Sequence, residues 1–177
     1  EHPRNIVVSF DGSDIPLDHL IFNIHTGQHF HVLIATSPAG GEYLRRQNHP
    51  RLRFFGPFTG PEEPAGTADL ADALADEAVI PVILTGKNNV PDTDTLLTLL
   101  KSLGTERLLI ESPTYTSHLL RKGKLDEYFI NYSMLFAGGP ISPNTRDPFS
   151  CRSHPHSKLL TLATHGADFL YTRQKLF

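Results

Sequence analysis

The chain is 177 residues long, which suits one domain with a buried core of its own. Hydrophobic residues make up 39% of it and charged residues 20%, and these ordinary globular proportions exclude a disordered or fibrous protein. A formal net charge of −3 without a basic cluster argues against a nucleic-acid partner. Every apolar run is far shorter than the ~20 residues of a membrane helix, so we expect no membrane span.

The cysteine content and the first residues of the chain indicate the cellular compartment in which the protein is found. Cys151 is the single cysteine, so no internal disulfide can form, which fits a reducing environment. Residues 1–5 lack the charged-then-apolar pattern of a secretion signal. We therefore expect a cytoplasmic protein.

Short apolar segments bounded by Gly, Asp and Pro predict the first strands. Residues 5–9 and 30–36 are typical of buried strands. A short helix is expected over residues 39–48, ended by His49-Pro50 because proline disfavours helical geometry in the residue before it. Residues 52–55 then predict another strand.

The middle of the chain predicts a loop and then two helices around a strand. Residues 56–66 hold three prolines and three glycines and are expected to form a loop. A helix follows over residues 67–78, and its leucines at 70 and 74 lie on one face. Residues 79–84 predict a strand. Asp92 or Thr93 then caps a helix that runs through Ser102.

The last third of the chain is expected to be richer in strands. Residues 107–110 predict a buried strand and residues 115–121 a helix, and a strand over 128–136 is broken at 137–140. Residues 158–164 and 169–176 predict a closing pair of strands around Gly166. The alternation of strands and helices indicates a single α/β domain over residues 1–177, with a mostly parallel sheet covered on both faces and antiparallel edge strands.

Three turns that follow predicted strands are candidate ligand sites. Ligands of open α/β sheets bind beyond the carboxyl ends of the strands. This rule selects residues 9–12, 85–89 and 111–115, and the last turn opens into a helix whose free N–H groups suit a phosphate. An ordinary helix cap is the more frequent role of such turns.

Three motifs in the second half of the chain carry a family resemblance. They are Arg107-Leu-Leu-Ile-Glu-Ser-Pro-Thr-Tyr, Gly123-Lys-Leu-Asp-Glu-Tyr and Phe136-Ala-Gly-Gly-Pro, and upstream Ile15-Pro-Leu-Asp continues the pattern. In order and spacing this sequence resembles the reductase domain of riboflavin biosynthesis, a relative of dihydrofolate reductase. The resemblance implies a three-layer dihydrofolate reductase-like α/β fold with a mostly parallel sheet and an antiparallel C-terminal edge hairpin.

The resemblance also implies a reaction, hydride transfer from NADPH to a ribosylaminopyrimidine phosphate by a homodimer. The nicotinamide carries the chemistry, and the protein positions the reactants and excludes water. By this resemblance Glu111 faces the substrate, while no catalytic residue is assigned. The residues implied to contact the cofactor are Arg4, Ser9, Thr85, Gly86, Ser112, Thr114 and Tyr115.

Two departures from the family pattern leave an alternative open. Ser112-Pro113 replaces a Gly-Gly pair that permits close approach to the cofactor, which adds bulk and removes one N–H donor. The family's first strand and its Ser-x-Asp-Gly segment would precede Arg4, so we expect that this segment is missing from the chain or has been lost. The alternative is a divergent, non-catalytic nucleotide-binding or interaction domain of the same fold.

The histidines and the cysteine suggest two further kinds of site, a metal site and a catalytic nucleophile. His25, His29 and His31 have spacings that zinc ligands use, as do His154 and His156, but solvated or hydrogen-bonded imidazoles are the commoner outcome, and we assign no metal. Cys151 near His154 suggests a nucleophile and its base, yet the Pro- and Ser-rich context favours an exposed free thiol.

Overall fold

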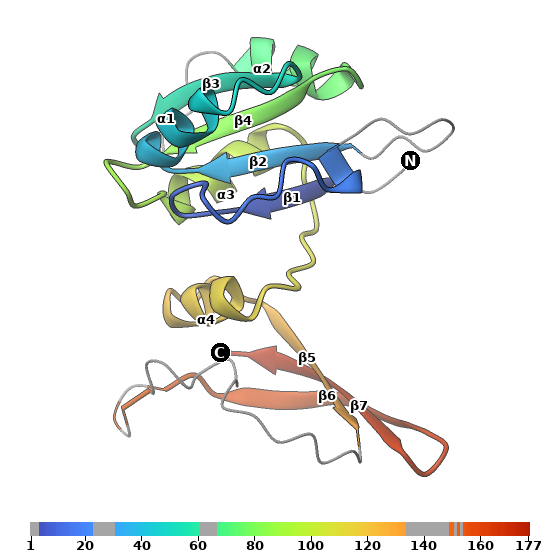
Figure 1. Cartoon of the computed structure of the whole chain (residues 1–177). Helices are drawn as coiled ribbons and strands as arrows, with labels where there is room; N and C mark the ends of the chain where they lie inside the picture. Colours follow the sequence, from blue (N-terminus) through green and yellow to red (C-terminus); the bar gives the residue numbers. More distant parts are fainter. Residues whose placement is uncertain (1–3, 23–30, 61–66, 134–148, 151, 153) are drawn as a thin grey trace. The chain divides into compact units, whose positions relative to one another are not determined.

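The computed structural model describes residues 4–22, 31–60, 67–133, 149–150, 152 and 154–177 (Figure 1). The chain divides into two compact units, Glu1–Leu108 and Leu109–Phe177. Each unit contains a sheet of its own.

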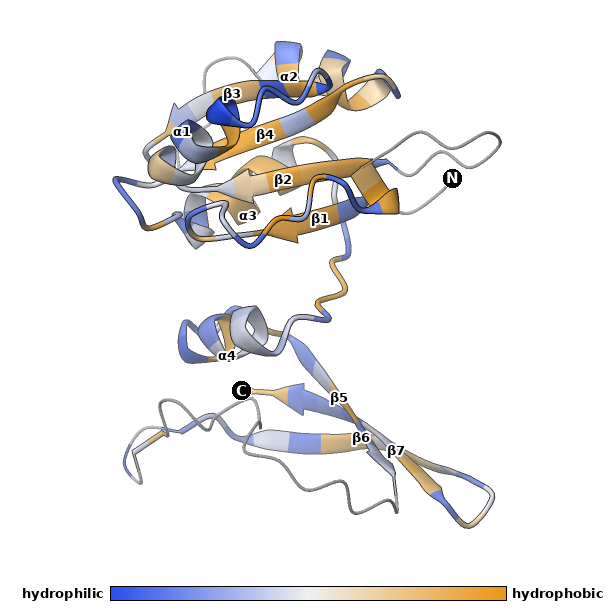
Figure 2. Ribbon diagram, viewed as in Figure 1, coloured by the Kyte–Doolittle hydropathy of each residue, from blue (hydrophilic) through white to orange (hydrophobic). Residues whose placement is uncertain are grey.

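The first unit is built on a four-stranded parallel sheet in the order β1-β2-β4-β3. Its strands are β1 (Asn5–Val8), β2 (Val32–Thr36), β3 (Leu52–Phe58) and β4 (Ile80–Thr85). Every residue of β2 and β4 is buried, and Figure 2 shows both strands as mainly apolar. Continuous apolar runs of this kind are typical of parallel strands with both faces covered. The four strands predicted in this unit are therefore confirmed, and β3 continues three residues into the expected loop.

Two apolar clusters cover the two faces of this sheet, so the first unit has three layers. On one face Leu33 and Ala35 of β2 pack with leucines of α2 (Thr67–Ala75) and α3 (Thr93–Ser102). On the other face Ile34 of β2 packs with Leu44 of α1 (Pro38–Arg46) and with Phe22 of the 3-10 helix η1 (Leu20–Phe22). Alternate residues of one strand thus enter opposite cores, as the pleat of a strand requires.

Local side-chain hydrogen bonds explain where the helices begin and end. The Ser37 hydroxyl accepts from the Gly40 N–H at 3.1 Å, and Pro38 occupies the first helical position, so α1 begins before the predicted residue 39. Helix α2 ends at Ala75, earlier than predicted, because the Asp76 carboxylate accepts from the Ala78 N–H at 2.9 Å and closes a turn.

The second unit consists of α4 (Pro113–Arg121) and an antiparallel sheet in the order β5-β7-β6. The strands are β5 (Glu127–Ser133), β6 (Ser157–His165) and β7 (Phe169–Leu176). The predicted C-terminal hairpin is confirmed, and it pairs with β5 in a separate sheet. The α/β class, with parallel strands and an antiparallel C-terminal hairpin, is therefore confirmed, whereas the break predicted at 137–140 lies outside the described residues.

The prediction of a buried strand at residues 107–110 is wrong. These residues form no strand, and the side chain of Leu109 is 77% exposed. An apolar run becomes a strand only where a neighbouring strand satisfies its backbone N–H and C=O groups. Within the described strands, none pairs with this run, and the boundary between the two units falls after Leu108.

The amino ends of the strands are held together by Arg51, which precedes β3. Its guanidinium donates to the backbone carbonyl of Phe22, to that of Ala78 at 3.1 Å and to that of Glu77 at 2.8 Å. These three carbonyls belong to η1 and to the connection between α2 and β4. One side chain therefore joins segments that are far apart in the sequence.

His49 beside this arginine makes stability depend on pH. Burial of the imidazole, and then the Arg51 charge, lower the pKa of His49 below its ordinary value of 6.5. Since the unfolded chain takes up this proton at higher pH, the His49 contribution is complete above about pH 6.5 and is lost as pH falls through the folded pKa. Urea unfolding between pH 7.5 and 5 should show a shallower loss of stability for His49→Gln than for the parent chain. Equal slopes for His49→Gln and the parent would contradict this assignment.

No helix in the described part of the chain combines the length and apolar character needed to cross a membrane.

Candidate functional site

The carboxyl ends of the four parallel strands meet at one edge of the first unit, where the connecting turns are polar. Ser9 follows β1, Thr36 ends β2 and Ser37 follows it, and Thr85 ends β4. Because β1 neighbours β2, and β2 neighbours β4, these turns lie side by side along the edge. We call this set of turns the carboxyl edge, and it is the position at which open α/β sheets bind ligands.

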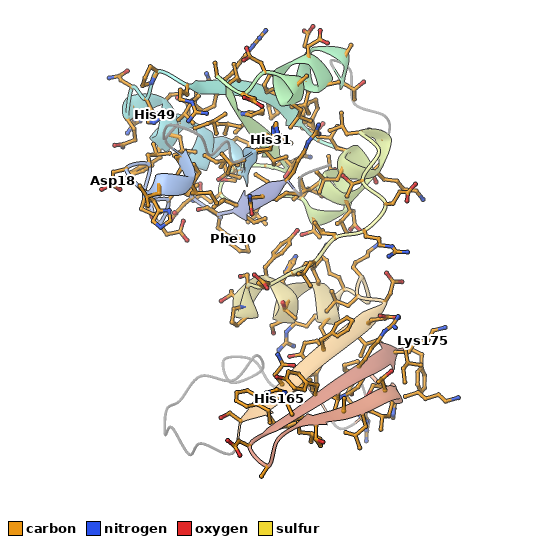
Figure 3. The ribbon with its side chains drawn as sticks, turned by 90° about the vertical axis from the view of Figure 1, so that its right-hand side faces the viewer. Phe10, Asp18, His31, His49, His165 and Lys175 are labelled. Carbon is orange, nitrogen blue, oxygen red and sulfur yellow. The ribbon has the colours of Figure 1, made fainter. Side chains whose placement is uncertain are left out.

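The turn after β1 is held by the buried side chain of Ser9. The Ser9 hydroxyl donates to the Asp14 carboxylate and accepts from the Gly12 N–H at 2.8 Å. Asp11 projects into solvent, and the Ser13 side chain and then its backbone N–H donate to its carboxylate and lower the pKa of Asp11. Ser9 therefore shapes the turn, whereas Asp11 presents a negative charge. Figure 3 shows the neighbouring Phe10 side chain projecting from the end of β1.

The turn after β2 was missed by the sequence reasoning, although it opens α1 directly at the carboxyl edge. Pro38 has no N–H, Ala39 donates to the Asn88 carbonyl at 3.0 Å, and Gly40 donates to the Ser37 hydroxyl. The first N–H groups of α1 are thus satisfied within the protein and are not offered to an anion. The Ser-Pro pair directly after a strand, followed by Gly40-Gly41, was the signal that could have revealed this turn.

Gly40 permits a close contact between α1 and the turn after β1. A Cβ atom at this position would lie 2.0 Å from the Thr36 hydroxyl oxygen and 3.0 Å from the Asp11 carbonyl carbon. The backbones of the two turns therefore approach each other directly.

The turn after β4 uses Thr85 and Gly86 for its own geometry. The buried Thr85 hydroxyl accepts from the Asp92 N–H at 3.1 Å. Gly86 has φ 78°, and a Cβ atom there would lie 2.2 Å from the Val90 carbonyl oxygen. Within this turn Lys87 and the two asparagines that follow it are exposed. Lys87 thus contributes a solvent-exposed cation at the carboxyl edge.

The structure separates the predicted cofactor residues of the first unit into two groups. Ser9, Thr85 and Gly86 gather at the carboxyl edge. Arg4 precedes β1 and lies at the amino end of the strand that Ser9 follows. At about 3.3 Å per residue, the two positions are roughly 16 Å apart along the chain. Arg4 and Ser9 are therefore not brought together.

The remaining predicted residues belong to the start of α4 in the second unit. Glu111 and Thr114 are exposed, and the Ser112 hydroxyl caps the helix by accepting from the Tyr115 N–H at 3.3 Å. Tyr115 is buried, and its ring stacks on His118 with centroids 5.9 Å apart. Ser112-Pro113 thus forms the same pair of cap and first helical residue as Ser37-Pro38.

Of the candidate metal-binding histidines, the structure describes His31, His154 and His156. The His31 Nε2 atom lies 4.0 Å from a Glu77 carboxylate oxygen, and the rings of His154 and His156 have centroids 4.7 Å apart. Over the described residues, no group of three or more His, Cys, Asp or Glu side chains is suited to hold a metal ion. His25, His29 and Cys151 lie outside the described residues.

Comparison with known protein families found no family whose model matches the chain, and comparison with curated proteins likewise found no match. The resemblance to the riboflavin-pathway reductases thus stays a prediction from the motifs themselves.

Proposed function

We propose that this chain is an NADPH-dependent, pyrimidine reductase-like protein that binds its nucleotide ligand at the carboxyl edge and reduces a ribosylaminopyrimidine phosphate or a related heterocycle. The observation that carries the proposal is the alignment of three polar turns at the carboxyl ends of neighbouring parallel strands. The motif resemblance supplies the reaction and the cofactor. A cytoplasmic homodimer is part of the same proposal.

Side chains rather than helix N–H groups would hold the phosphates at this edge. The first N–H groups of α1 are occupied by Ser37 and Asn88, whereas Lys87 is exposed in the turn after β4. An ammonium group stabilises phosphate as a point charge. NADPH would supply the hydride, and the chain would position it and exclude water. The roles of Glu111, Ser112, Thr114 and Tyr115 remain predictions from the resemblance.

Cofactor binding by the full chain tests this proposal. NADPH titration followed by nucleotide fluorescence should give saturable binding, and Lys87→Gln should weaken it roughly tenfold through loss of one charge-assisted contact. Lys101→Gln is the matched control, since Lys101 is an exposed lysine in the last turn of α3. Absence of NADPH binding, together with absence of NADPH oxidation with a panel of pyrimidine phosphates, would refute the proposal.

A second candidate is a divergent domain of the same fold that binds a nucleotide-like ligand without reducing anything. Ser112-Pro113 favours it, because these residues build a helix cap where the family has a Gly-Gly pair. Restoring Gly-Gly at positions 112 and 113 is expected to confer little NADPH affinity on such a domain. Tight binding in that double variant would indicate a recently altered reductase instead, and isothermal titration calorimetry distinguishes the two outcomes.

A further inference from the structure

The formal charge of the chain is divided unequally between the two units. Residues 109–177, the second unit, hold eight lysines and arginines against five acidic residues and so carry a formal charge of +3. Residues 1–108 hold eight against fourteen and carry −6. The net charge of the whole chain argues against a polyanionic partner, but an asymmetry of this kind favours anion binding by one part of a chain. The second unit is therefore the part that attracts a polyanion.

The antiparallel sheet of this unit gathers its charged side chains on one face, which we call the cationic face. Directly opposite residues of an antiparallel pair share a face, and successive residues alternate between faces. The observed registers therefore place every charged or histidine side chain of the three strands on this face. All of its residues are exposed except Glu127, which is half-buried. The cationic face consists of Glu127, Phe129, Asn131, Ser133, Lys158, Thr161, Ala163, His165, Phe169, Tyr171, Arg173 and Lys175.

Two lysines of the cationic face lie side by side without an acidic partner among the described residues. Lys158 of β6 is directly opposite Lys175 of β7. The neighbouring Glu127 carboxylate accepts two hydrogen bonds from the Arg173 guanidinium, at 2.7 and 2.6 Å, and within the described part of the chain neither lysine forms an ion pair. Like charges directly opposite each other destabilise a pair of strands. A phosphate bound between the two ammonium groups would remove this repulsion.

Three exposed aromatic rings lie on the same face as these cations. Phe129 is 57% exposed, Phe169 38% and Tyr171 39%. The Arg173 guanidinium carbon lies 5.9 Å from the centroid of the Phe129 ring, and the rings of Phe169 and Tyr171 are stacked with centroids 5.9 Å apart. In the observed register Phe129 and Tyr171 are diagonal neighbours, with Cα atoms about 7–8 Å apart. Exposed rings interleaved with cations are the combination by which proteins bind single-stranded nucleic acids.

We propose that the cationic face binds a single-stranded nucleic acid, a function separate from the proposed reduction. The rings of Phe129 and Tyr171 stack on bases, and the ammonium groups of Lys158 and Lys175 contact phosphates of the same strand. A duplex keeps its bases stacked internally, so it offers phosphates but no free base faces to these rings. Because point charges and ring faces accept every base, binding is expected to be largely independent of nucleotide sequence.

Fluorescence anisotropy of a labelled single strand of about twelve nucleotides, titrated with the full chain, tests the proposal. Saturable binding is expected, and the duplex of the same sequence should bind at least tenfold more weakly. Two phosphate contacts predict that raising the salt concentration from about 50 to about 200 mM weakens binding roughly sevenfold. Replacing both Lys158 and Lys175 by glutamine should remove most of this salt dependence. Phe129→Leu and Tyr171→Leu should each weaken binding about fivefold or more, since each removes a stacked base.

Two control variants should bind the strand as tightly as the parent chain. Tyr132→Leu removes an aromatic ring that is 45% exposed on the opposite face of β5. Lys101→Gln removes one exposed positive charge from α3 of the first unit. Far-UV circular dichroism of every variant shows whether its fold is retained.

Three results would overturn the proposal. The first is a strand that stays unbound at about 100 µM chain, the weak end of sequence-independent affinities. The second is equal binding of strand and duplex, or unchanged binding by Phe129→Leu and Tyr171→Leu. The third is binding of phosphatidylserine vesicles without binding of the strand, which would assign the cationic face to a membrane surface. None of the proposed cofactor residues lies on β5, β6 or β7, so excess NADPH should not displace the strand, and Lys87→Gln should leave strand binding unchanged.

Discussion

Replacing Gly86 by alanine is expected to lower the free energy of unfolding of the first unit by roughly 3–4 kcal/mol. Two effects add at this position. The left-handed φ of 78° is unfavourable for any residue with a side chain, and the new Cβ atom would lie 2.2 Å from the Val90 carbonyl oxygen and 2.7 Å from the Asp92 nitrogen. Both neighbours are backbone atoms that close the turn after β4. Urea unfolding followed by circular dichroism measures the loss.

Gly104→Ala separates the two effects. Gly104 has a similar φ of 87°, but a Cβ atom there would meet nothing within 4 Å. Its substitution should cost only the backbone term, about 1–2 kcal/mol. Equal losses for the two variants would show that the close approach at Gly86 contributes nothing. If Gly86→Ala is unfolded at 25 °C while Gly104→Ala stays folded, this result still shows that the substitution at Gly86 costs more stability.

Arg51→Met is expected to destabilise the first unit by about 2–3 kcal/mol. Methionine retains much of the apolar stem but leaves the carbonyls of Phe22, Glu77 and Ala78 without the guanidinium donors. Arg51→Lys should recover only part of the loss, because an ammonium group does not reproduce the planar arrangement of guanidinium donors. Urea unfolding of the three proteins at pH 7.5 provides the comparison.

The control for Arg51 is Arg53→Met, two residues further along, in β3. Arg53 is exposed, and its guanidinium carbon lies 5.6 Å from the centroid of the Phe55 ring. An exposed contact of this kind is worth about 0.5–1 kcal/mol. If Arg53→Met and Arg51→Met lower stability equally, Arg51 does not act as the connection between η1, β3 and the segment before β4.

The sequence pattern was sufficient to predict those elements whose conformation is determined by residues close by in the sequence. β2 and β4 are apolar throughout because both faces of the sheet are covered, and Asp92 caps α3 through its own side chain, with the Thr95 N–H at 2.8 Å. The hairpin around Gly166 was likewise predictable, because strand-forming residues on both sides flank a glycine with φ 59°. In each case nearby residues decide the conformation.

The sequence pattern failed where the outcome depends on distant neighbours. The run at residues 107–110 is as apolar as a strand, but no described strand pairs with it. At the candidate site, Ser9 and Gly86 follow β1 and β4 directly, and Thr85 is the last residue of β4. The hydrogen-bond partners of Ser9 and Thr85, which are Asp14 and Asp92, were not predictable, because they reach these residues only through the folded turns. The close approach of the Val90 carbonyl to Gly86 was not predictable for the same reason. The hydrogen bond from the Ala39 N–H at the start of α1 to the Asn88 carbonyl likewise joins two turns far apart in sequence.

The strand order of the parallel sheet has a consequence for synthesis of the chain. β4 lies between β2 and β3, so β3 has no partner in the sheet until the ribosome has released residues up to Thr85. Until then Phe54, Phe55 and Phe58 of β3 lack the strand against which they are aligned in the finished sheet. Domains generally fold as units during translation, and apolar segments exposed in the meantime are prone to aggregate. We therefore expect a nascent chain that stalls shortly before β4 to bind chaperones. The first unit can close only after both β4 and α3 have been released, because leucines of α3 cover one face of the sheet.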